Sequence, residues 1–150
     1  MKKTFSLCLV IFSCYWYCSA QHFATAAEFS PAALTQSQSG ADAVIADAFA
    51  RRKSNIQVTG EGTVVKLLKD DNDGSRHQKF IVSLRSGQTV LIAHNIDLAP
   101  RIDAIQRGDN IQFSGEYEWS HKGGVIHWTH RDPRGKHLAG WLKHNGKVYQ

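Results

Sequence analysis

All three cysteines of this 150-residue chain, Cys8, Cys14 and Cys18, lie within its first 18 residues. The rest of the chain therefore forms no disulfide bonds and has no thiol chemistry, so its fold depends on a closed apolar core. Any metal ion bound there needs nitrogen and oxygen ligands. The length corresponds to a single domain.

The cysteine-containing segment has the organisation of a secretory signal. Met1-Lys2-Lys3 is basic, Phe5 to Tyr17 is mainly apolar, and small residues follow at Ala20 and Ala26. This order is typical of a cleaved export signal, and the apolar run is short for a membrane span. The sequence therefore predicts an exported protein, periplasmic or secreted, with cleavage after Ala20 or Ala26.

The remaining chain divides into a linker and one domain. Residues 1–26 are the expected signal peptide, residues 27–40 a flexible linker rich in Ala, Ser and Gln, and residues 41–150 the domain. A lipid anchor at Cys14 is disfavoured, because the residues before it are bulkier than a lipidated cysteine requires.

The domain is expected to be mainly β. Apolar residues at helical spacing predict a short amphipathic helix over Ala41–Lys53, and from Ile56 onward short alternating segments separated by turn residues are typical of strands. The predicted strands are Ile56–Leu68, Lys79–Leu84, Thr89–Ala93, Asn110–Trp119 and Val125–Trp128, followed by a hairpin of Trp141–Lys143 and Lys147–Tyr149 around Asn145-Gly146.

Three strands, a longer connection and two more strands follow the order of an oligonucleotide/oligosaccharide-binding (OB) barrel. We therefore predict a small five-stranded OB-like barrel with a short N-terminal helix and a C-terminal hairpin. An SH3-like barrel is the alternative. Closing the sheet into a barrel also removes exposed strand edges.

Charge is distributed unevenly along the chain. Residues 119–150 contain six lysines and arginines against one acid, and five of the eight histidines. Such a region could bind a polyanionic partner such as nucleic acid or an acidic glycan, although the charge alone favours a solvated surface.

Polar residues gather at the ends of the second and third predicted strands. Arg76 and His77 precede the second strand, and His94, Asn95 and Asp97 follow the third. Because a tight turn at Ser86-Gly87 joins these strands, we expect the five residues to share one rim of the barrel. They are candidates for ligand binding, with Asp97 orienting an imidazole. The alternative is that they only cap the strand ends.

The densest group of candidate metal ligands is His127, His130, Asp132 and His137. Strand alternation predicts that His127 and Thr129 share a face while Trp128 fills the core. Imidazoles with a carboxylate suit zinc or another divalent transition metal, and an open coordination position activates water. We therefore take His127, His130 and Asp132 as candidate catalytic residues and His127, His130 and His137 as candidate metal ligands, although their spacing matches no established motif.

Aromatic and basic side chains alternate near this group. Trp119 and Arg131 are candidates for ligand contacts, because aromatic rings interleaved with bases stack on nucleobases or sugars. Filling the barrel core is the alternative role for the tryptophans.

Several longer stretches resemble a family of small exported bacterial proteins described only as a domain of unknown function. The resemblance covers about residues 41–150 and implies one compact domain from a bacterium, with no activity attached. The stretches that carry it are Gly62–Val65, Arg76–Phe80, Leu91–Pro100, Gly115–Trp119, Gly123–His130 and Gly140–Trp141.

Two functional classes remain from the sequence. The favoured one is a binding module for a polyanion or small ligand, since small barrels commonly bind such ligands. The alternative is a metal-dependent hydrolase, such as a secreted or periplasmic nuclease, in which Arg76 or Arg131 stabilises a developing negative charge. A fold alone does not decide between them.

Overall fold

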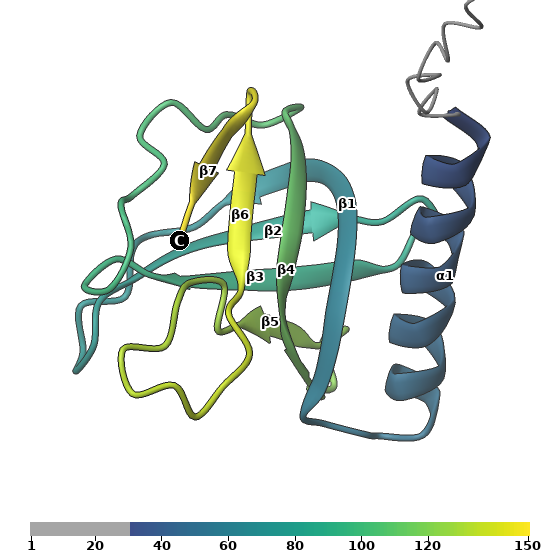
Figure 1. Ribbon diagram of the computed structural model, residues 1–150, viewed down its shortest axis with the longest axis horizontal. Helices are drawn as coiled ribbons and strands as arrows, with labels where there is room; N and C mark the ends of the chain where they lie inside the picture. The colour runs from purple at the N-terminus through teal and green to yellow at the C-terminus, as the bar shows by residue number, and fades with distance from the viewer. Residues whose placement is uncertain (1–30) are drawn as a thin grey trace, which may run out of the picture.

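The protein, seen in a computed structural model, is a small barrel with one helix beside it (Figure 1). The structure describes residues 31–150, with side chains from Gly40 onward. The elements in chain order are α1 (Pro31–Ala50), β1 (Ile56–Leu67), β2 (His77–Ser83), β3 (Thr89–Asn95), β4 (Asn110–Glu118), β5 (Val125–His127), β6 (Trp141–His144) and β7 (Lys147–Tyr149). None of the helices within these residues is long and apolar enough to cross a bilayer.

The 12-residue strand β1 closes the barrel. Its first part, Ile56–Thr63, pairs antiparallel with β4, and its second part, Thr63–Leu67, pairs antiparallel with β2 through a bulge after Val64. The sheet then runs from β2 to β3, β5 and β4, with β3 and β5 parallel. The predicted five-stranded barrel with an N-terminal helix and two further C-terminal strands is confirmed.

Alternating side chains build the core. Along β2 and β3 every second residue is buried, and the residues between them are half-buried or exposed on the outer face. The largest fully buried apolar side chains are Tyr117, Phe80, Phe113, Ile45, Ile92, Ile102, Ile111, Ile126 and Leu142. This alternation leaves the outer face of the barrel to carry polar groups.

Helix α1 packs against β1 through Ile45 and Ala48, which are both buried. Asp42 ties the helix to the β2–β3 turn, since its carboxylate accepts a 3.0 Å hydrogen bond from the Ser86 backbone N–H. The helix begins at Pro31, inside the segment expected to be linker, because Pro is well tolerated in a first helical turn. The predicted signal peptide, residues 1–26, lies outside the described residues.

The C-terminal hairpin extends the sheet along the edge of β4. Residues Gln112–Ser114 of β4 pair with β6, and residues Glu116–Glu118 pair with β5. Asn145 and Gly146 form the predicted tight turn, with φ angles of 48° and 80°. One edge of β4 therefore serves two strands in succession, and the chain between them, residues 128–140, forms a loop outside the barrel.

Candidate functional site: a carboxylate–histidine cluster on the outer face

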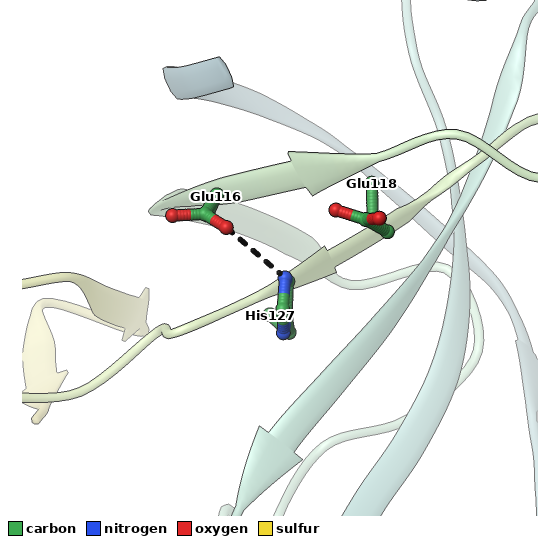
Figure 2. Close-up of side chains that lie close together, drawn as sticks. All are labelled: Glu116, Glu118 and His127. Atoms are coloured by element: carbon green, nitrogen blue, oxygen red, sulfur yellow. Dashed lines mark ion pairs between the residues drawn. The ribbon is translucent and has the colours of Figure 1, made fainter. Parts of the chain in front are cut away.

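The outer face of β4 and β5 brings together two carboxylates and an imidazole. Glu116 and Glu118 flank Tyr117 on β4, so they point outward while the tyrosine fills the core. Glu116 lies directly opposite His127 in the antiparallel pairing of β4 with β5. One ligand atom from each of Glu116, Glu118 and His127 lies within 4.8 Å of the others. Figure 2 shows the two carboxylates on one strand and the ring reaching them from the next.

The Nε2 atom of His127 is buried and has no hydrogen-bond partner. Its nearest acidic oxygen, Oε1 of Glu116, lies 3.6 Å away, which is too far for a good hydrogen bond. Burial lowers the pKa of His127, although Glu116 and Glu118 oppose the shift. A buried imidazole nitrogen without a hydrogen-bond partner reduces the stability of the folded protein. The neutral imidazole is also the form that binds metal ions.

The chain leaves the barrel immediately after His127. Trp128 has a φ of 50°, in the left-handed region, so strand alternation ends there. A Cβ at Gly140 would clash with the carbonyl oxygens of Trp128 and Ser114, so only glycine allows the loop to return this close to the barrel.

Two predictions about this segment are therefore wrong. Trp128 is half-buried and stacks on the ring of His137 at 3.7 Å instead of filling the core. His127 and Thr129 do not share a face, since Thr129 is fully buried and His127 faces outward.

Asp132 organises the loop. Its Oδ1 accepts a hydrogen bond from the backbone N–H of Arg134, and its Oδ2 accepts hydrogen bonds from those of Lys136 and His137. These donors, first that of Arg134, lower the pKa of the carboxyl group. Asp132 thus lies outside the cluster and fixes the loop that presents His137.

His137 is the second imidazole beside Glu116. Its Nδ1 lies 3.5 Å from Oε2 of Glu116, while His127 lies near the other oxygen. A carboxylate flanked in this way resembles a metal ligand held in place by an outer partner. His137 therefore lies where it can orient Glu116.

A cavity of about 400 Å³ lies next to the cluster. His127 forms part of its wall, together with His77 and Asn95 from the ends of β2 and β3 and with Trp128 and His130 from the loop. The two predicted groups, the strand-end rim and the loop histidines, therefore meet at one cavity through His77, Asn95, His127 and His130.

His94 is absent from this wall because it points inward. His77 pairs with Asn95 and Gln78 pairs with His94, so His77 and His94 lie on opposite faces of the sheet. Nδ1 of His94 accepts a 2.8 Å hydrogen bond from the Thr129 hydroxyl, and Nε2 donates one of 3.2 Å to the Pro100 carbonyl. Burial lowers the pKa of His94 to about 4.

The remaining predicted residues have partners of their own. Asp97 accepts hydrogen bonds from the backbone N–H and the guanidinium of Arg76, at 2.8 and 2.7 Å, and these bonds lower its pKa. The indole of Trp119 donates to the Phe49 carbonyl at the end of α1, away from the cluster. Arg131 is exposed on the loop.

Glu116 and Glu118 were missed in the sequence. Their signal is the alternation Glu-Tyr-Glu, which places two acids on the outer face of a strand whose core residue is the tyrosine. Pairing that strand with the one containing His127 requires the register of β4 and β5, which no short sequence pattern provides.

Residues 29–150 match the family model described as Protein of unknown function (DUF3465). The chain belongs to this family. No curated protein matches the chain. The family supports the resemblance seen in the sequence, and it attaches no chemistry to the Glu116–Glu118–His127 cluster.

Proposed function

We propose that this DUF3465 protein is a metal-dependent hydrolase that holds a divalent transition metal ion, such as zinc, on Glu116, Glu118 and His127. The observation that carries the proposal is the buried, unpartnered Nε2 of His127 beside two carboxylates. An imidazole and carboxylate oxygens are common zinc ligands, and a catalytic zinc site has three protein ligands and one open position.

The cavity beside the cluster offers space for a substrate. Because His127 belongs both to the cluster and to the cavity wall, a molecule bound in the cavity would lie beside the imidazole that holds the metal ion. A bound divalent ion lowers the pKa of a coordinated water molecule and makes that water a nucleophile near neutral pH. A module that binds a ligand but holds no metal ion and catalyses no reaction would leave the unpaired Nε2 of His127 unexplained.

The test is metal analysis of protein purified without a histidine tag. We expect one zinc ion per chain after dialysis, a rise in melting temperature with zinc, and loss of both in Glu116→Gln and His127→Ala. His121→Ala is the matched control, since His121 is exposed on the β4–β5 turn and outside the cluster. Equal zinc binding by wild type and His127→Ala would refute the site.

A binding module for nucleic acid or an acidic glycan is the second candidate. It is favoured by the strand order β1-β2-β3-β5-β4, which closes on β1 with β3 and β5 parallel and suits an OB-like barrel. Binding of single-stranded DNA or heparin that weakens with salt, by protein that takes up no metal, would favour this candidate over the hydrolase.

We also propose that the protein acts outside the cytoplasm, on the basis of its signal-like leader. Mass spectrometry of protein from the periplasm or culture medium should show a chain that begins after Ala20 or Ala26. A chain that retains its leader inside the cell would contradict export.

A further inference from the structure

The cavity beside the metal cluster has one uncompensated strong cation. Arg134 lies on its wall, and no carboxylate within residues 40–150 forms an ion pair with the Arg134 guanidinium. The nearest acid in the sequence, Asp132, accepts hydrogen bonds from the backbone N–H groups of the loop. A free guanidinium on a cavity wall is suited to bind a carboxylate or phosphate through two parallel hydrogen bonds.

Two histidines of the same wall have their tautomers fixed by the backbone. Nδ1 of His77 lies 2.7 Å from the Ser75 carbonyl, and Nδ1 of His130 lies 2.8 Å from the Arg131 carbonyl. A carbonyl only accepts, so Nδ1 of each ring carries the proton. When these rings are neutral, Nε2 of each remains as a base, and when they are charged it becomes a donor to an anion.

The charge of the metal cluster determines when an anion can enter. Glu116 and Glu118 carry two negative charges, which repel an anion from this end of the cavity, whereas a divalent ion cancels them. An anionic group would then bind between the metal ion and Arg134, and its binding would depend on the metal.

The loop extends this positive surface beyond the cavity. Arg131 and Lys136 are exposed on either side of Arg134 in the sequence, and Trp128 lines the cavity itself. A substrate with a single anionic group would leave these flanking charges unused. A nucleic-acid strand offers a phosphate every nucleotide, and it also offers bases to an aromatic side chain.

We propose, on the basis of the metal site above, that the substrate is a phosphodiester in single-stranded nucleic acid, with its phosphate between the metal ion and Arg134. The oxygen of a water molecule forms a new bond to phosphorus, and the bond from phosphorus to one ester oxygen breaks. The proton lost by the water passes to Nε2 of His77 or His130, and the resulting imidazolium gives up that proton, through solvent, to the departing alkoxide. The products are a phosphomonoester and an alcohol, with no oxidation or reduction.

The experiment compares Arg134→Gln with Arg107→Gln in the full domain loaded with zinc. Arg107 is exposed on the β3–β4 connection and does not line the cavity. Zinc content is measured first, followed by hydrolysis of bis(p-nitrophenyl) phosphate and of a single-stranded oligonucleotide. We expect Arg134→Gln to keep its zinc and to lose about 10- to 100-fold in kcat/KM for both, with Arg107→Gln unchanged.

The outcomes separate the two proposals. Failure of wild type to bind zinc would overturn the metal site itself. Zinc binding with equal diester rates in wild type and Arg134→Gln, or hydrolysis of p-nitrophenyl acetate but not of the diesters, would leave the metal site standing and overturn the phosphodiester substrate. Zinc-dependent binding of heparin with no cleavage of the oligonucleotide would also overturn it, in favour of an acidic glycan.

Discussion

His94 and His127 lie on neighbouring parallel strands, yet the barrel treats them in opposite ways. Burial lowers the pKa of both rings. His94 points inward and uses both nitrogens in hydrogen bonds, to Thr129 and Pro100. His127 points outward and leaves a buried nitrogen without a partner beside two carboxylates. Burial therefore lowers the pKa of both histidines, and the two rings differ in whether their buried nitrogens have hydrogen-bond partners.

The largest expected effect concerns the pH dependence that His94 confers on stability. In the unfolded chain His94 takes up a proton below its ordinary pKa of 6.5, but in the folded protein only below about 4. The unfolded state therefore binds more protons between these values, so stability falls as the pH falls through this window. We expect a loss of about 3 kcal/mol from this residue between pH 6.5 and 4.

Urea unfolding of wild type and His94→Gln across this range measures the effect. Glutamine can still donate to Pro100 and accept from Thr129, but it does not titrate. The difference in unfolding free energy between the two proteins should change with pH as stated. A constant difference would show that His94 is not held neutral by burial.

Thr129→Val tests whether the His94 site depends on its partners. Valine has nearly the same shape as threonine and leaves Nδ1 of His94 without a donor, so we expect a loss of about 1–2 kcal/mol in the free energy of unfolding at pH 7.5. Thr63→Val, at an exposed position of β1, is the control and should change it by less than about 0.5 kcal/mol. Equal losses in both variants would show that the hydrogen bond from Thr129 to His94 does not contribute to the free energy of unfolding.

His127→Leu should have the smallest effect on stability, and with the opposite sign. Leucine removes the unpartnered nitrogen, so metal-free protein should be unchanged or more stable by up to about 1 kcal/mol in urea. His94→Leu, which orphans Thr129 and Pro100, should destabilise. Similar losses in the free energy of unfolding of His127→Leu and His94→Leu would show that the two histidines play the same role.

Most of the barrel could be predicted from the sequence because the alternation of apolar and polar residues within each strand indicates which side chains face the core. Some signals depend only on residues that are neighbours in the sequence, so they can be recognised without knowing the tertiary structure. They are the alternation over Lys79–Leu84 and Thr89–Ala93 and the turn at Asn145-Gly146. The signal peptide, in contrast, stays a prediction, since it lies outside the described residues.

The candidate site could be predicted only in part because it depends on contacts between strands. His127 was identified from its neighbours in the sequence, but Glu116 reaches it through the register of β4 and β5. The prediction that Thr129 faces the same side of the sheet as His127 failed because a single left-handed residue, Trp128, ends the strand alternation. His77 and His94 were expected to share a rim, and an offset of one residue in pairing placed them on opposite faces.

The shared edge of β4 has a consequence for how such a barrel can change. The loop over residues 128–140 starts from β5 and returns through β6, and both strands are fixed to the same strand, β4. Its two ends are therefore set by the barrel, whereas the entropy of closing it rises only slowly with added residues. Its exposed part, residues 133–139, can gain, lose or exchange residues without altering the strand register, whereas Thr129 and Gly140 pack against the barrel. A barrel of this design can thus keep Glu116, Glu118 and His127 constant while the loop sets which molecules approach them.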